Sequence, residues 1–101
     1  MNPPTSNHPA KCLVAIPPGG IWLCYILRCA DNTLYTGMTN DLEKRLAAHN
    51  AGTAAKYTRG RSPVELVFVE SCADRSAALK REMEIKSLVR GEKLALIKSV
   101  K

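Results

Sequence analysis

The sequence predicts an α+β fold, with a small three-stranded antiparallel sheet flanked by helices in the order β-β-α-β-α-α. Three short apolar runs bounded by turn residues predict the strands, at residues 21–29, 33–38 and 64–70. The helices are predicted where apolar residues recur at helical spacing. Capping residues before these segments and glycines after them mark the helix ends. The chain has 101 residues, of which 46% are hydrophobic, so one domain with one modest core is expected.

The N-terminal segment differs in composition from the rest of the chain. Residues 1–20 hold five of the six prolines and end in "PPGG". This composition is typical of a flexible tail, so we expect the domain to occupy residues 21–101. The apolar patch at residues 13–16 could dock on the domain, although nothing in the sequence requires it.

The strand predictions rest on apolar patterning. Residues 21–29, "IWLCYILRC", are apolar on both alternating faces apart from Arg28, which favours a central strand covered on both sides. The turn signal "ADN" at residues 30–32 joins this strand to residues 33–38 as a hairpin. The third strand, "VELVFVE", follows a basic loop at residues 52–63.

Capping residues and glycines delimit the predicted helices. The first begins after a cap at residue 40 or 41 and reaches about residue 50, where Gly52 stops it. The second begins after a cap at residue 74 or 76 and reaches about residue 89. Gly91 separates it from a short last helix at residues 92–99.

Two polar side chains border the core-facing stripe of the first helix. Helical spacing places Leu42 and Leu46 in that stripe, with Arg45 and His49 along its border and next to each other. A cation in this position is held by packing and can point at a fixed target. The alternative is an arginine that only extends its head group from the core edge to water.

The second helix carries two glutamates in different positions. Its predicted apolar arc consists of Ala78, Leu79, Met83, Ile85 and Val89. Glu82 falls inside this arc, whereas Glu84 falls outside it. An inward carboxylate is costly unless it is paired, binds a metal or opens into a cleft. An ion pair of Glu82 with Lys86 or with Arg45 is therefore the alternative to a functional role.

Net charge and loop composition favour an anionic partner. The formal charge is +6, and the five basic residues from Lys44 to Arg61 are accompanied by no acidic residue. This favours nucleic acid over a membrane surface. The loop "AGTAAKYTRGRSP" places Tyr57 among Lys56, Arg59 and Arg61, a composition that suits phosphate contact and base stacking. The alternatives are a solvated loop and a charge that serves solubility.

The cysteines and the apolar runs bear on the compartment. The four cysteines, Cys12, Cys24, Cys29 and Cys72, contain no CxxC pair, so a zinc site is not expected. Cys24 and Cys29 should lie on opposite faces of one strand as buried, reduced thiols, which favours the cytoplasm. No apolar run approaches the roughly 18 residues of a membrane span or the length of a signal-peptide core.

Four segments carry a resemblance to a known family. They are "LCY" at residues 23–25, "YTG" at residues 35–37, the helix "TNDLEKRLAAH" and the helix "ALKREMEIKSL". In their order and spacing, and with the "AKYTRGR" loop, they resemble the GIY-YIG endonuclease superfamily, in particular its small stand-alone bacterial proteins. The resemblance covers about residues 21–90.

The resemblance implies a metal-dependent endonuclease that hydrolyses DNA phosphodiester bonds, acting in DNA repair or processing. By this resemblance, Glu82 binds one divalent ion, Mg²⁺ or Mn²⁺, and Tyr25 is the general base. Arg45 stabilises the phosphoryl charge, while Tyr35 and His49 orient the water and phosphate or share the proton. The nucleic-acid contacts implied are those of Lys44, Lys56, Tyr57, Arg59 and Arg61. The residues do not discriminate DNA from RNA.

Departures from the family pattern keep other functions open. The glycine and isoleucine of the first signature are absent. Met38 stands where many catalytic members carry lysine, and no asparagine follows the glutamate helix; Arg59 or Lys56 could substitute. With no attached targeting domain, low sequence selectivity is expected. The alternatives are a nucleic-acid-binding module with weak or no catalysis, and a scaffold whose polar cluster is an ion-pair network.

A shared active site sets a requirement on the hairpin turn. A two-residue turn would place Tyr35 opposite Arg28, and so on the other face of the sheet from Tyr25. We therefore predict a three-residue or bulged turn at residues 30–32.

Overall fold

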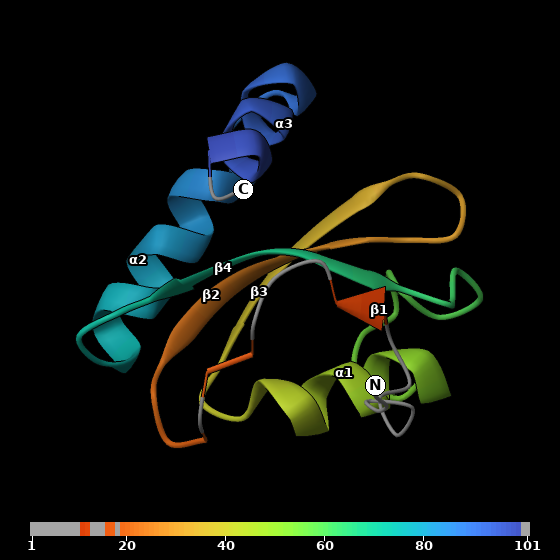
Figure 1. Cartoon of the computed structure of the whole chain (residues 1–101), viewed down its shortest axis with the longest axis horizontal. Coiled ribbons are helices and arrows are strands. Elements are labelled where there is room, and N and C mark those ends of the chain that lie inside the picture. Colours follow the sequence, from red (N-terminus) through yellow and green to blue (C-terminus); the bar gives the residue numbers. More distant parts are fainter. Residues whose placement is uncertain (1–10, 13–15, 18, 100–101) are drawn as a thin grey trace, which may run out of the picture.

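The computed structural model describes residues 11–12, 16–17 and 19–99, which form a four-stranded sheet with helices on both of its faces (Figure 1). The elements are β1 (Lys11–Cys12), β2 (Leu23–Arg28), β3 (Leu34–Thr39), α1 (Leu42–Ala51), β4 (Glu65–Ser71), α2 (Arg75–Lys86) and α3 (Arg90–Ser99). The predicted α+β class and the antiparallel arrangement of three strands are confirmed. The sheet order is β1-β4-β2-β3.

The two-residue strand β1 was not predicted. It lies in the N-terminal segment and pairs in parallel with β4, with Lys11 opposite Glu65. Most of residues 1–20, including much of the apolar patch at residues 13–16, lie outside the described residues. Ile16 is described, and it packs against the core on the α1 side of the sheet.

The hairpin between β2 and β3 has the three-residue turn that a shared site requires. Leu27 lies opposite Tyr35, and Tyr25 lies opposite Gly37. The turn is closed by hydrogen bonds between Cys29 and Thr33, and between Asn32 and Cys29, while Asn32 takes a positive φ of 69°. Because residues an even number apart share a face, Tyr25 and Tyr35 project from the same side of the sheet.

The core is divided between the two faces of the sheet. One cluster joins Tyr25, Leu27 and Leu66 to Leu42 and Leu46 of α1. The other joins sheet residues to Ile85 of α2 and Ile97 of α3. Cys29 belongs to the first cluster and Cys24 to the second, as predicted, and Cys24, Cys29 and Cys72 are free thiols.

Helix α1 begins and ends at the predicted residues. Asp41 is its N-cap, with a side-chain oxygen that accepts from the backbone N–H of Lys44. Gly52 is its C-cap at φ 79°, a left-handed conformation that glycine adopts without strain. The fixed ends set which residues of α1 face the sheet, and Leu42, Leu46 and His49 are buried.

Helix α2 is shorter than predicted and faces the sheet differently. It ends at Lys86, and Gly91 lies in the first turn of α3, where Glu92 accepts from the backbone N–H of Val89. Ala78 and Ile85 are the residues that α2 buries. The prediction that Leu79, Met83 and Val89 face the core is wrong, because they are 42%, 63% and 66% exposed.

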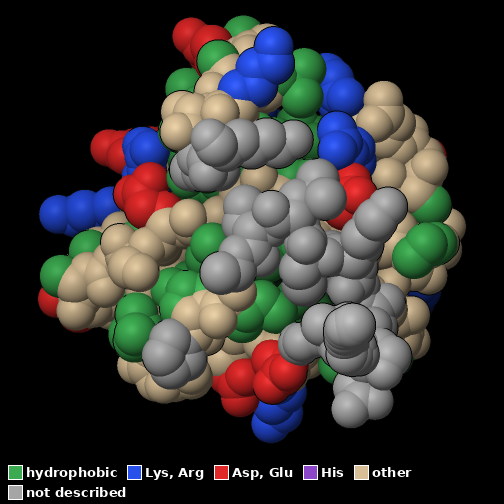
Figure 2. Space-filling model, in the orientation of Figure 1, with side chains coloured by type: hydrophobic (Ala, Val, Ile, Leu, Met, Phe, Trp, Pro, Cys, Tyr) green, Lys and Arg blue, Asp and Glu red, His purple; other side chains and the backbone are tan. Residues whose placement is uncertain are grey.

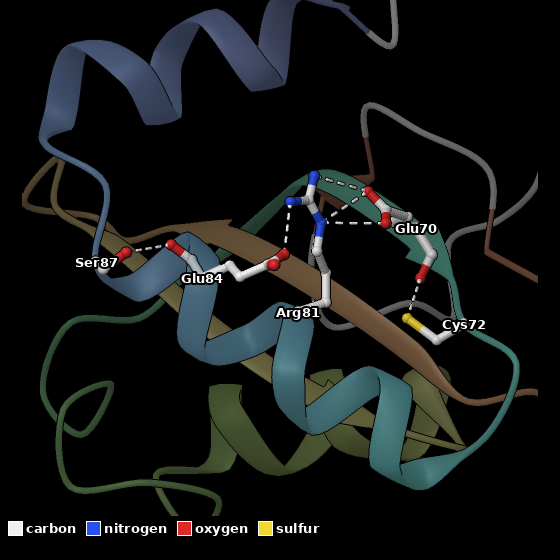
Figure 3. A network of polar contacts seen from close by, with 5 residues as sticks. All are labelled: Glu70, Cys72, Arg81, Glu84 and Ser87. Carbon is white, nitrogen blue, oxygen red and sulfur yellow. Dashed lines mark hydrogen bonds and ion pairs between the residues drawn. The ribbon is translucent and has the colours of Figure 1, made fainter.

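A network of charged side chains ties α2 to β4 (Figure 3). Arg81 donates from Nε and Nη2 to the carboxylate of Glu70 at 3.1–3.3 Å, and from Nη1 to Glu84 at 3.1 Å. These contacts help to determine the rotation of α2 over the sheet. Glu84 lies on the outer side of α2. Glu82 directly follows Arg81 in the chain.

Candidate active site

A pocket of about 370 Å³ lies at the β3 edge of the sheet, between α1 and α2. We call it the β3 pocket. Its walls come from residues that precede or belong to four elements: Trp22, Tyr25, Tyr35, Gly37, Met38, Thr39, Asn40, Arg45, Arg75, Leu79 and Glu82. Four of the five residues predicted to be catalytic therefore line one cavity, although they come from four segments of the chain.

The fifth, His49, lies behind the pocket wall. It is 1% exposed, and its Nε2 lies 2.9 Å from Tyr25 Oη. It does not line the β3 pocket, so it has no direct access to a bound phosphate. It contacts the pocket through the phenol of Tyr25.

Gly37 makes room for this phenol. A Cβ at position 37 would lie 2.5 Å from Oη and 2.7 Å from Cζ of Tyr25, closer than side-chain atoms can approach. The tyrosine of one strand thus crosses the backbone of the next at the point where that backbone has no side chain. This explains the glycine of the "YTG" segment by packing alone.

Tyr35 continues the aromatic contacts toward the basic loop. Its ring lies edge-on to His49, with centroids 5.1 Å apart, and tilted to Tyr57 at 5.6 Å. The guanidinium of Arg61 covers Tyr57 at 4.5 Å and forms an ion pair of 2.7 Å with Asp31 of the hairpin turn. Arg61 and Tyr57 therefore hold the loop against the sheet.

Burial keeps both members of the Tyr25–His49 pair neutral. Together with the charge of Arg45, burial lowers the pKa of His49 to about 4. Burial raises the pKa of Tyr25, and the neighbouring Tyr35 adds to this. Without a ligand, the phenol therefore retains its proton at neutral pH and the imidazole carries no charge.

The lowered pKa of His49 should make the protein sensitive to mild acid. A histidine that stays neutral when folded binds a proton more readily when unfolded, so stability is complete above pH ~6.5 and falls as the pH approaches 4. Between pH 7 and pH 5 the free energy of unfolding should drop by about 2 kcal/mol through this residue. Urea unfolding at the two pH values measures the drop. His49→Gln should remove most of it, and an equal drop in the variant would contradict this account.

Glu82 is the carboxylate of the β3 pocket. Its side chain is only 15% exposed, and Lys86 Nζ lies 3.6 Å from Oε2. This is the ion pair considered from the sequence, but it is long and its lysine is 52% exposed, so it contributes little. In the described part of the chain, Arg45 forms no ion pair with Glu82 or with any other carboxylate.

The donor set of the pocket suits one hard cation. The described residues contain no group of three or more His, Cys, Asp or Glu side chains arranged to hold a metal. A single carboxylate fits Mg²⁺, or the similar Mn²⁺, because Mg²⁺ keeps several waters and binds through one or two carboxylates and substrate phosphates. Zinc, which takes several nitrogen or sulfur ligands, does not fit.

Three of the residues predicted to contact nucleic acid, Lys44, Lys56 and Arg59, lie outside the pocket. They are exposed, and neither they nor Arg45 form an ion pair within the described residues. Figure 2 shows one face of the molecule, where Lys and Arg side chains lie around the margin together with Asp and Glu.

Comparison with models of protein families shows which family this chain belongs to. Residues 21–95 match the model of the GIY-YIG catalytic domain, which is most of the chain. The chain belongs to the GIY-YIG family. This is a nuclease family whose members act on nucleic acids and generally use a divalent metal.

Relatives of this GIY-YIG domain include small proteins of similar length. The UPF0213 protein of Natronomonas pharaonis is 59% identical over 73 residues, which cover 72% of this chain and 86% of the relative. That of Clostridium perfringens is 57% identical over 75 residues, 74% of this chain and 81% of the relative. The solution structure of a protein from E. faecalis is 37% identical with a TM-score of 0.59, and covers 84% of this chain and 91% of that one.

Two features of this GIY-YIG domain were not found from the sequence. Thr58 is fully buried and contacts His49, yet a threonine in a basic loop carries no pattern that marks it. The contact between Gly37 and Tyr25 joins two strands, so neither segment shows it alone.

In the described part of the chain, no helix is long and apolar enough to cross a membrane.

Proposed function

We propose that this GIY-YIG protein is a metal-dependent endonuclease that hydrolyses DNA phosphodiester bonds with low sequence specificity. One observation carries the proposal. The β3 pocket brings a largely buried carboxylate, Glu82, together with a guanidinium, Arg45, that forms no ion pair with any described residue, and with a phenol, Tyr25, that is hydrogen-bonded to a neutral imidazole. A cation site, a charge for a phosphoryl group and a proton acceptor are the three parts that phosphodiester hydrolysis needs.

Glu82 is assigned as the residue that holds the divalent ion. When bound, this ion supplies positive charge that orients the scissile phosphate and stabilises the leaving oxygen. Arg45 adds a second positive charge from the α1 side of the pocket, where negative charge builds on the phosphoryl oxygens. Tyr35 lines the same wall and is assigned to the orientation of the water and the phosphate.

Tyr25 and His49 are assigned to move the proton of the attacking water. The phenol oxygen accepts that proton while its own proton passes to His49 Nε2. The water oxygen bonds to phosphorus, the bond to the leaving oxygen breaks, and the leaving oxygen takes a proton from solvent. The negative charge of the bound phosphate favours the imidazolium that forms, and the proton later returns to solvent through Tyr25.

DNA binding is assigned to the exposed cations. Lys44, Lys56 and Arg59 contact backbone phosphates, which position the duplex but carry no sequence information. Arg61 and Tyr57 support the loop that presents Lys56 and Arg59. The free thiols of Cys24, Cys29 and Cys72 support a reducing compartment such as the cytoplasm, and DNA repair or processing is the proposed context.

A cleavage assay tests the proposal directly. The protein is incubated with supercoiled plasmid and with single-stranded DNA, in the presence of Mg²⁺, Mn²⁺ or a chelator. We expect cleavage with either metal and none with the chelator. Salt-sensitive binding without cleavage under any metal would replace the proposal by a nucleic-acid-binding module. Absence of both binding and cleavage would leave a scaffold function.

A further inference from the structure

A side chain from the basic loop reaches the candidate active site from behind. Thr58 stands between exposed residues, yet it is itself 0% exposed. Its Oγ1 lies 2.8 Å from His49 Nδ1 and 3.2 Å from the carbonyl oxygen of Ala55. Tyr25, His49 and Thr58 therefore form one buried chain of hydrogen bonds that starts at the β3 pocket and ends on a backbone carbonyl.

Counting the protons of this chain assigns the form of the imidazole. The carbonyl of Ala55 can only accept, so the single hydroxyl proton of Thr58 is donated to it. Thr58 Oγ1 then faces His49 with a lone pair, and Nδ1 must carry the proton. In a neutral imidazole this leaves Nε2 as the acceptor, which takes the proton of Tyr25 Oη. The opposite tautomer would leave the Ala55 carbonyl without its donor.

We propose that Thr58 is a positioning residue, which fixes His49 in the tautomer whose Nε2 can receive the proton of Tyr25. The catalytic role inferred for Thr58 rests on the function proposed above, whereas the tautomer of His49 can be tested without any activity. Thr58 does not line the β3 pocket, so it acts only through the imidazole.

The hydroxyl of Thr58, and not its bulk, is the part that matters. Valine has nearly the shape of threonine but offers no acceptor to Nδ1. In Thr58→Val the proton of the buried imidazole should move to Nε2, where it can be donated to Tyr25 Oη. That tautomer cannot receive the phenol proton, so proton transfer from Tyr25 to His49 is interrupted. Thr58→Ser retains the hydroxyl and should restore the original form.

Nitrogen NMR of the imidazole reads the tautomer directly. The chain has two histidines, and the variant His49→Gln identifies which signals belong to position 49. In the wild type and in Thr58→Ser we expect the proton of His49 on Nδ1. In Thr58→Val we expect it mainly on Nε2. Circular dichroism verifies that each variant is folded at the temperature of measurement.

Cleavage rates with Mg²⁺ test the consequence. Thr58→Val should cleave DNA about 100-fold more slowly than the wild type, whereas Thr58→Ser should retain most of the activity. A proton on Nε2 in the wild type, or an unchanged tautomer in Thr58→Val, overturns the assignment. A changed tautomer with undiminished cleavage overturns the positioning role. If the wild type cleaves no DNA, the proposed function fails, and the tautomer measurement still decides the role of Thr58.

Discussion

Replacing Glu82 by glutamine should lower metal-dependent DNA cleavage by about a thousandfold or more. Glutamine preserves the size of the side chain but removes the charge that holds the divalent ion. The ion stabilises developing charge by several kcal/mol, and each 1.4 kcal/mol changes the rate about tenfold. Among the residues that line the β3 pocket, Glu82 is the single acidic one, so no second acidic side chain there can replace it.

Glu84→Gln is the matched control on the same helix. Glu84 is 67% exposed and forms an ion pair with Arg81 (Figure 3), and neither residue lines the β3 pocket. Its loss should leave the cleavage rate nearly unchanged. Initial rates of plasmid nicking over a range of Mg²⁺ concentrations give the comparison, and DNA affinity in chelator should be similar for both variants. Equal losses in the two variants, or a Glu82→Gln rate within tenfold of the wild type, would refute the assigned metal site.

Replacing Tyr25 by phenylalanine should lower the cleavage rate by about 10²–10⁴-fold, because the water loses its proton acceptor. The same change leaves Nε2 of His49 buried without its hydrogen-bond partner, which should cost about 1–3 kcal/mol of stability. The rate is measured by plasmid nicking at saturating Mg²⁺, and the stability by urea unfolding at pH 7.

Tyr57→Phe is a suitable control for Tyr25→Phe. Tyr57 is 41% exposed, contacts Tyr35 and Arg61 through its ring, and its hydroxyl forms no hydrogen bond within the described residues. We expect both its rate and its stability to stay near those of the wild type. Nicking that persists in Tyr25→Phe and in Glu82→Gln alike would indicate a contaminating nuclease. Undiminished, chelator-sensitive cleavage in Tyr25→Phe alone would remove the phenol from the mechanism.

Local sequence signals predicted most of the fold. The ends of α1 follow from Asp41 and Gly52, whose capping roles depend on the backbone next to them. The three-residue hairpin turn was predicted from a geometric requirement. Tyr25 and Tyr35 lie on paired strands, and they share a face only when the turn between the strands has an odd number of residues or a bulge. The two-residue strand β1 could not be predicted, because so short a segment has no period of its own.

The face of α2 was predicted wrongly for a physical reason. Two of its large apolar residues, Leu79 and Met83, are exposed, and the residues that it buries are Ala78 and Ile85. The hydrophobic pattern predicts that the large apolar residues face the core. In the structure, the pairing of Arg81 with Glu70 also helps to determine the rotation of the helix. Glu82 is nevertheless largely buried, because it lies on the side of α2 that faces the β3 pocket.

The candidate site was predicted only in part because its contacts are long-range. Tyr25, Tyr35, Arg45 and Glu82 were identified by a family pattern, and the structure places them around one cavity. The same pattern placed His49 in the wall of the site, whereas it lies behind Tyr25 and does not line the pocket, and the pattern gave no position for Thr58. Those relations depend on how a loop folds back on α1, which no spacing within either segment records.

The contact between Gly37 and Tyr25 links two positions in the history of this chain. A side chain at position 37 would collide with the phenol of Tyr25 and would also lie 3.1 Å from Cε2 of Tyr35, whereas a small residue at position 25 would remove the closer collision. A descendant that lost its tyrosine could therefore acquire a larger residue at position 37 after only a small shift of Tyr35. Among relatives, a side chain larger than glycine at this position, accompanied by a small residue at position 25, would mark lineages in which the phenol has gone out of use.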